Sequence, residues 1–194
     1  MSMSNHSRAE LSARSHSIDC FLNSLLQEFD SFRWIRSPKD GRPNELAIPL
    51  DAQRELRVPV AHYSALGRHS FGPELLLRDH SAPRVVGFSE FSALLTEKLD
   101  RDSGGTGVNR ARFLGRLGQS RRVMETSLAT RERDLARLYS PELEFLRAEQ
   151  GLLLGHAFHP TPKSRDEFSD ADLAAFSPEF AARFPLRWWM ADPA

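Results

Sequence analysis

The sequence has a single cysteine, no long apolar run and no excess of charge of either sign. Because Cys20 has no second cysteine to pair with, an internal disulfide is excluded and a reducing compartment is expected. No apolar stretch reaches the roughly 20 residues that a membrane-spanning helix needs, and residues 1–14 lack the apolar segment of a secretory signal. We therefore expect a cytoplasmic protein with no membrane partner.

The net charge limits the partners that the chain can have, and its length limits the number of domains. The 26 Lys and Arg residues balance the 26 Asp and Glu residues, so no global field draws the chain to nucleic acid or to an anionic membrane. A chain of 194 residues is long enough for one good core, or for one domain with a helical appendage.

Residues 18–29 have the spacing of an amphipathic helix. The apolar side chains that recur on one helix face are Ile18, Phe21, Leu22, Leu25, Leu26 and Phe29. This pattern predicts a helix over residues 15–30, preceded by a flexible tail over residues 1–14. Cys20 lies beside the apolar stripe, so we interpret it as a small buried side chain rather than a nucleophile.

Residues 32–86 consist of short β-rich pieces separated by proline and glycine. Their connections are too short for helical crossovers, which favours antiparallel pairing. Proline cannot donate a ladder hydrogen bond, so Pro49 and Pro59 predict edge positions or bulges. The expected fold is α+β, a small and mostly antiparallel sheet packed with several helices. The strand candidates are Phe32–Ile35, Leu46–Leu50, Leu56–Tyr63, Leu75–Leu77 and Arg84–Val86.

Arginine is concentrated in residues 109–138, which contain eight of them. Helical spacing of Phe88, Phe91, Leu95 and Leu99 predicts a helix before them. The glycine-rich connector at residues 102–107 follows that helix and lacks the lysine of a phosphate-binding loop. Acidic residues interrupt the second half of the arginine run, a pattern typical of a solvated helix face. We therefore expect no nucleic-acid partner, and an Arg-rich nucleic-acid-binding module remains the less favoured alternative.

Three helix starts and one helix end are predicted towards the C-terminus. Ser140, followed by proline and glutamate, should begin a helix that ends at Gly155, a residue suited to the left-handed conformation of a helix stop. Ser169 with Asp172 resembles a capping box, and Ser177 precedes a second proline and glutamate.

Gly155 is followed by two prolines, which are Pro160 and Pro162. Each fixes φ and removes a backbone donor, so residues 159–163 are expected to run extended. Alternate side chains of an extended chain share a face. The side chains that would share one here are Thr161 and two cations that we expect to be exposed, Lys163 and Arg165. A lysine charge beside an arginine fork suits the oxygens of a phosphate or a carboxylate.

His156 and His159 stand before these cations and allow more than one interpretation. As structural residues, each ring would hydrogen-bond nearby backbone and brace a turn. As zinc ligands they would need one or two further donors, but no cysteine is near and the following acids, Asp166 and Glu167, are adjacent rather than helically spaced. We predict no metal site and assign no catalytic residue.

Residues 155–168 also resemble a family signature. They read Gly-His-Ala-Phe-His-Pro-Thr-Pro-Lys-Ser-Arg-Asp-Glu-Phe, similar to the Gly-His-Pro-x-His-Pro-x-x-Lys-x-Arg-x-Gly-Phe signature of the IucA/IucC-type siderophore synthetases. Ser177–Phe180 resembles the Ser-Pro-Glu block that follows the signature, and Leu56–Val60 and Gly67–Pro73 resemble the family's N-terminal strands more loosely. Two positions depart from the signature: Ala157 replaces a proline and Glu167 replaces a glycine.

The resemblance implies an ATP-dependent acid–amine ligase of siderophore biosynthesis, with ATP and Mg²⁺ as cofactors. Such enzymes adenylate a carboxylate, citrate or a citryl derivative, and an amine or hydroxylated amine then displaces AMP. The residues that correspond to the family's ATP-contacting loop are His156, His159, Lys163 and Arg165. The residues that would support this loop are Gly155, Pro160, Thr161 and Ser164.

Family members are considerably longer than this chain, so the resemblance implies the N-terminal region of a larger synthetase fold that is inactive alone. Its expected parts are residues 15–101 (helix plus sheet), 102–154 (Arg-rich helical segment) and 155–194 (ATP-loop signature and an incomplete C-terminal end). A homodimer, and a non-catalytic fragment that binds a nucleotide or a partner chain, stay open.

Overall fold

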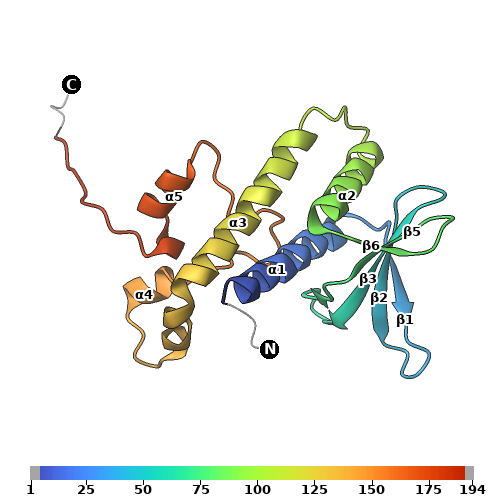
Figure 1. Cartoon of the computed structure of the whole chain (residues 1–194), viewed down its shortest axis with the longest axis horizontal. Helices are drawn as coiled ribbons and strands as arrows, with labels where there is room; N and C mark the ends of the chain where they lie inside the picture. The colour runs from blue at the N-terminus through green and yellow to red at the C-terminus, as the bar shows by residue number, and fades with distance from the viewer. Residues whose placement is uncertain (1–4, 191–194) are drawn as a thin grey trace.

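A β-sheet lies at one end of the molecule, short helices lie at the other, and three longer helices lie between them (Figure 1). The computed structural model describes residues 5–190. The long helices are α1 (Asn5–Glu28), α2 (Phe88–Asp102) and α3 (Arg110–Leu135). The shorter ones are η1 (Ala136–Tyr139), α4 (Phe145–Glu149), α5 (Asp170–Phe176) and η2 (Pro178–Phe180). No helix of the described part is both long and apolar enough to cross a bilayer.

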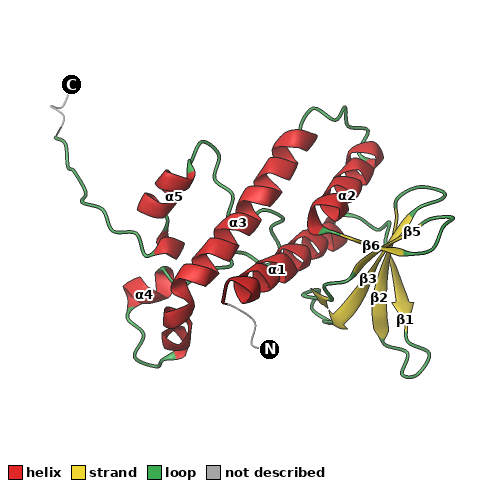
Figure 2. Ribbon diagram, in the orientation of Figure 1, coloured by secondary structure: helices red, strands yellow, loops and turns green. Residues whose placement is uncertain are grey.

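The sheet has six strands, and all of its pairs are antiparallel. The strands are β1 (Arg33–Arg36), β2 (Pro43–Pro49), β3 (Glu55–His62), β4 (Ser70–Phe71), β5 (Leu75–Arg78) and β6 (Arg84–Val86). They follow the order β1-β2-β3-β5-β6, and β4 pairs with the far end of β3. The predicted α+β class is confirmed (Figure 2). Strand β4 was not among the predicted strands.

We predicted edge positions or bulges at the two strand prolines: the edge alternative is wrong, but a register irregularity follows Pro59, between Val60 and His62. Both β2 and β3 are interior strands, and Pro49 is the last residue of β2. Pro59 lies in β3 between the residues that pair with β5 and those that pair with β4. The missing proline donor is therefore accommodated at a strand end and at a change of partner.

The core forms where α1 and α2 meet the sheet. The predicted apolar face of α1 is confirmed, and Cys20 within it is fully buried. Leu46, Ile48 and Leu56 contribute from the sheet, and Phe91 contributes from α2. This end of the molecule is therefore organised by apolar burial.

Helix α1 begins earlier than predicted. Residues 5–14, which we expected to form a flexible tail, are helical, and Ala9 and Ala13 are buried. Two small side chains four residues apart extend the buried face of α1 towards α3, a signal too weak to predict a helix. Residues 1–4 of the predicted tail lie outside the described part of the chain.

The helix predicted from Ser140 to Gly155 is wrong at both ends. The hydroxyl of Ser140 accepts a hydrogen bond from the N–H of Glu142, so it caps a turn. Helix α4 begins only at Phe145 and spans five residues. By contrast, the capping box of Ser169 is confirmed at the start of α5.

Candidate functional site

Gly155 allows a close approach within the signature run, which we define as residues 155–165. Its φ is +79°, and a Cβ here would lie 2.8 Å from the Cβ of Pro162. The left-handed conformation agrees with the sequence, but Gly155 does not end a helix because α4 stops at Glu149. The glycine instead lets the chain fold back against Pro162.

The signature run forms two turns rather than the extended chain that we predicted. The N–H of His159 donates to the carbonyl of His156 (3.3 Å), and the N–H of Ser164 donates to the carbonyl of Thr161 (3.2 Å). Pro162 occupies the second position of the latter turn, where its fixed φ is favourable. The hydroxyl of Ser164 also donates to the Thr161 carbonyl, so both residues support the run.

His156 and His159 are exposed, and each braces its own turn. Nδ1 of His156 accepts from the N–H of Phe158 (3.2 Å), and Nδ1 of His159 accepts from the N–H of Thr161 (3.1 Å). When Nδ1 accepts, Nε2 carries the proton of the neutral ring. Each ring can therefore stabilise its turn and still donate a hydrogen bond from Nε2 to an external group.

Lys163 and Arg165 point inward to one acid, Glu179. Arg165 donates from Nη1 to Oε1 (2.7 Å) and from Nη2 to Oε2 (3.2 Å). Nζ of Lys163 lies 3.5 Å from Oε2 and donates to the carbonyl of Leu152. Lys163 is only 7% exposed and Glu179 1%, so our prediction that both cations are exposed fails for Lys163. Arg165 keeps 29% of its side chain accessible.

Burial and charge pairing oppose each other in this cluster. Burial favours the protonated form of Glu179, but the hydrogen bonds from Arg165 and the nearby charges outweigh burial and lower its pKa. Burial also lowers the pKa of Lys163, and the attraction of Glu179 only partly opposes this shift. Each buried charge thus depends on the others for its stability.

Helix α3 holds the backbone of the signature run. The hydroxyl of Ser120 accepts from the N–H of Lys163 (3.0 Å), and Oε1 of Gln119 accepts from the N–H of Arg165 (2.8 Å). Both contacts join positions more than 40 residues apart in the chain. No motif in the sequence indicated them.

Arg131 of α3 is a buried link between several segments. Its Nη1 donates to the carbonyls of Gln150 (3.0 Å) and Glu179 (3.2 Å), and its Nε donates to Asp134 (2.7 Å). Sequence reasoning missed Arg131 because it lies in an arginine-rich run that resembles a solvated face. The Ser-Pro-Glu block was the only signal that pointed to Glu179.

Two further arginines of α3 bind the acid that follows the signature run. Asp166 accepts from Nη2 of Arg112 (2.6 Å) and from Nε of Arg116 (2.8 Å), and these bonds hold the pKa of its carboxyl well below the usual range. The arginine concentration of the sequence is therefore used in part to attach the run to α3.

Glu167 adopts a left-handed backbone, with φ at +68°. It is the position at which the family signature has glycine, so the departure noted in the sequence falls where glycine would be unstrained. Ala157 lies in the first turn and has an ordinary backbone conformation.

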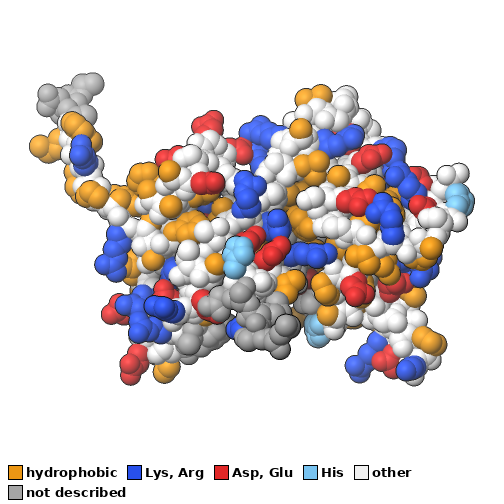
Figure 3. Space-filling model, viewed as in Figure 1, with side chains coloured by type: hydrophobic (Ala, Val, Ile, Leu, Met, Phe, Trp, Pro, Cys, Tyr) orange, Lys and Arg blue, Asp and Glu red, His pale blue; other side chains and the backbone are white. Residues whose placement is uncertain are grey.

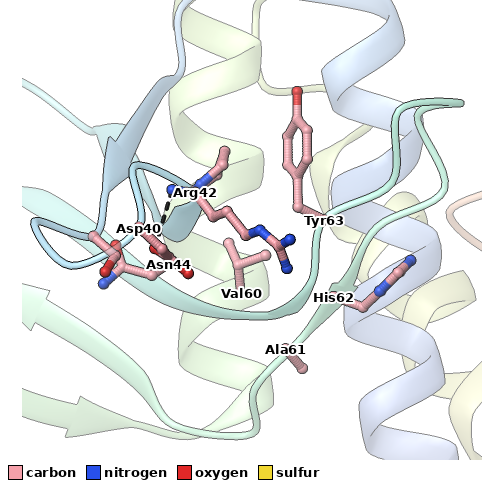
Figure 4. A pocket seen from close by; sticks show the side chains of 9 residues that line it. Asp40, Arg42, Asn44, Val60, Ala61, His62 and Tyr63 are labelled. Carbon is pink, nitrogen blue, oxygen red and sulfur yellow. Dashed lines mark hydrogen bonds between the residues drawn. The ribbon is translucent and has the colours of Figure 1, made fainter.

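A cavity of about 460 Å³ lies apart from the signature run, beside the β1–β2 hairpin (Figure 4). Arg42, Val60 and Tyr63 are among its lining residues, and none of the predicted site residues reaches it. Within residues 5–190, no group of three or more His, Cys, Asp and Glu side chains is placed to hold a metal ion.

Comparison with known proteins places these features in a family. Residues 144–194 match the model of the IucA / IucC family. The rhizobactin siderophore biosynthesis protein RhbC of Rhizobium meliloti is 36% identical over 185 residues, which cover 95% of this chain and 30% of that protein. The N(2)-citryl-N(6)-acetyl-N(6)-hydroxylysine synthase of Escherichia coli is 35% identical over 184 residues, 95% of this chain and 31% of the synthase.

A solved structure gives the same result. The ATP-bound aerobactin synthetase IucA from a hypervirulent pathotype of Klebsiella pneumoniae superimposes with a TM-score of 0.82 at 34% identity, over 90% of this chain and 30% of that one. The chain thus spans about 30% of the length of these relatives. Over 90–95% of its length the chain is thus similar to siderophore synthetases, and its residues 144–194 match the IucA / IucC family model.

Proposed function

We propose that this chain is the N-terminal part of an ATP-dependent siderophore synthetase and that its signature run forms one wall of the nucleotide site. In the complete enzyme, a carboxylate such as that of citrate or a citryl derivative would attack the α-phosphate of ATP, forming an acyl-adenylate and releasing pyrophosphate. An amine or hydroxylated amine would then form the amide and release AMP. The observation that carries the proposal is the pair of exposed histidines in the same run as two cations that share one acid, in a chain 34% identical to a synthetase solved with ATP.

Charge accounting supports a phosphate ligand. Lys163 and Arg165 are two cations against the single carboxylate of Glu179. Arg112 and Arg116 are likewise two cations against Asp166. Each cluster therefore carries one net positive charge next to the signature run, which favours the binding of an anion there.

The site residues then divide into two roles. His156 and His159 would donate from Nε2 to phosphate oxygens, and Arg165 would add its accessible edge. Lys163 would hold the run through Leu152 and Glu179. Loop support would come from Gly155, Pro160, Thr161 and Ser164. Mg²⁺ would accompany ATP and be bound largely by phosphate oxygens and water, since this ion commonly takes only one or two protein carboxylates.

Two other readings are less well supported. A non-catalytic fragment that binds a nucleotide or a partner chain would have the same signature run and would differ only in lacking turnover. A nucleic-acid module needs unpaired arginines on one face, but five of the eight in residues 109–138 pair with acids. Basic and acidic side chains are interspersed on the face drawn in Figure 3.

Asparagine variants test the proposed donors. The oxygen of an asparagine can replace Nδ1 as the acceptor that braces each turn, but no group replaces the Nε2 donor. We expect His156→Asn and His159→Asn to weaken ATP·Mg²⁺ binding about tenfold each in calorimetric titrations of the chain, with little change in melting temperature. His80→Asn, in an exposed loop of the sheet, is the matched control.

Unchanged ATP affinity in both asparagine variants would show that the rings only brace their turns. A hydroxamate-trapping assay with citrate, ATP and an amine separates the remaining readings. We expect no turnover by the chain alone, because the proposal places most of the nucleotide and carboxylate pockets in the part of the synthetase beyond this segment. Turnover by the isolated chain would contradict that assignment.

A further inference from the structure

One face of α1 holds two segments that are far apart in the sequence. The side chains on this face follow helical spacing: His16, Asp19, Cys20 and Asn23. One attached segment is the signature run. The other is Gly67–Pro73, the second motif that resembles the family, which the proposed function does not yet use.

Three residues of α1 bind alternate residues of the second motif. The amide of Asn23 accepts from the N–H of His69 (3.1 Å) and donates to its carbonyl (2.8 Å). Oδ1 of Asp19 accepts from the N–H of Phe71 (2.8 Å). Arg14 donates from Nη2 to the carbonyl of Pro73 (3.0 Å). The motif is therefore fixed along the helix by a regular series of hydrogen bonds.

The signature run reaches the same face. The Sγ atom of Cys20 lies 3.5 Å from the carbonyl oxygen of His156 and 3.3 Å from Nε2 of His16. His16 is also hydrogen-bonded to the backbone of Leu154. Because Asp19 and Cys20 are consecutive, the two segments meet on either side of one helical turn.

Arg68 lies where the two segments meet. It is exposed, it precedes the fixed residue His69, and its side chain has no hydrogen bond or ion pair among the described residues. Burial lowers the pKa of His16, and the charge of Arg68 lowers it further. Burial raises the pKa of Asp19 to about 6, and the same charge opposes that shift. Geometry gives the same position: Asn23 holds the next residue, His69, about one helical turn from Cys20, which contacts His156.

We propose that Arg68 binds an anionic oxygen group on the same surface as His156, so that the two motifs form one composite site. This inference rests on the proposed function of the signature run and adds a residue to it. Lys163 and Arg165 are engaged with Glu179, whereas Arg68 offers a complete guanidinium fork. The fork fits either a phosphate of the nucleotide or a carboxylate of the acid substrate.

Arg68→Ala tests the inference, with Arg78→Ala as the control. Arg78 is an exposed arginine at the end of β5 whose side chain has no acid partner among the described residues, so both variants lose one comparable charge. The chain is titrated separately with ATP·Mg²⁺ and with citrate. We expect Arg68→Ala to weaken one of the two about tenfold and Arg78→Ala to leave both unchanged. Loss of ATP affinity identifies a phosphate, and loss of citrate affinity identifies a carboxylate.

A second measurement, by NMR, detects binding that is too weak for calorimetric titration. The Nε–H resonance of Arg68, assigned by its loss in Arg68→Ala, is followed while ATP·Mg²⁺, inorganic pyrophosphate or citrate is added to millimolar concentration. A shift with any of these probes supports the inference. If the resonance shifts with none of them, the inference is overturned. If His156→Asn then still weakens ATP binding, the proposed function stands without Arg68.

Discussion

The two ends of the molecule are stabilised by different forces. Around the sheet, the buried side chains are almost all apolar and form one cluster, which includes Ile18, Phe21, Leu56 and Phe91. Around the signature run, the most deeply buried acid in the described chain is Glu179, with Lys163 and Arg131 beside it. In Figure 1 the sheet lies at one side of α1 and α3, and α4 and α5 lie at the other.

This difference separates what makes the chain fold from what makes the site specific. Apolar burial contributes about 25 cal/mol per Å² and depends little on direction. A buried ion cluster contributes little net stability, because desolvation offsets most of its attraction. It does, however, allow only a few arrangements of its hydrogen bonds. We infer that the sheet end stabilises the chain and that the charged end fixes the signature run.

Truncation in the apolar core is expected to have the largest effect. The ring of Phe21 contacts those of Phe91 and Phe113, with centroids 6.2 Å and 5.7 Å away. Phe21→Ala should lower the free energy of unfolding by about 3–5 kcal/mol, measured by urea denaturation. Hydrogen exchange should become faster in both ends of the molecule. Retained protection of residues 150–180 would mean that the charged end folds independently.

Neutralising the buried acid should have a smaller and more local effect. Glu179→Gln keeps one acceptor for Arg165 but leaves Lys163 without a countercharge, at a cost of about 3 kcal/mol. We expect amide exchange to accelerate in residues 150–180 while strand amides stay protected. Glu142→Gln, at an exposed turn, is the control and should change neither. Equally accelerated amide exchange in the strands would contradict the inference that the charged cluster stabilises only its own end of the molecule.

The same contrast explains which features could be predicted from sequence. The α1 stripe and five of the six strands follow from hydrophobic spacing, which is a local signal. The fold of the signature run depends on Ser120, Gln119 and Arg131, which are distant in the chain and have no distinctive spacing. Lys163 is buried and Arg165 half-buried because both pair with Glu179, a partner that the spacing of the two cations does not indicate. Sequence could identify the run through its family resemblance but not its conformation.

The pH dependence of the free energy of unfolding tests whether the carboxylate of Asp19, next to the apolar core, destabilises the folded state. Asp19 is half-buried, and burial raises its pKa from 3.8 to about 6. Between about pH 4 and pH 6 the native state therefore keeps a proton that the unfolded state has lost, so this group makes the free energy of unfolding fall as the pH rises. Asp19→Asn should match the wild type near pH 4 and exceed its stability at pH 7 by about 1 kcal/mol, after allowance for partial exposure.

Urea denaturation of both proteins from pH 4 to pH 8 measures this difference directly. Asp30→Asn, at an exposed position after α1, is the control and should run parallel to the wild type. A constant difference between Asp19→Asn and the wild type at every pH would show that the carboxyl titrates alike in both states.

The smallest expected effect concerns the backbone beside the charged end. Glu167 has a φ of +68°, a conformation that costs a residue with a Cβ about 1–2 kcal/mol. Glycine removes this strain but loses more entropy on folding, by roughly 0.5–1 kcal/mol. Glu167→Gly should therefore raise the free energy of unfolding by about 0.5–1 kcal/mol. Glu142→Gly, at a turn without positive φ, should lower it slightly. If the two glycine variants are destabilised alike, Glu167 is unstrained, and the glycine of the family signature serves close ligand approach rather than backbone conformation.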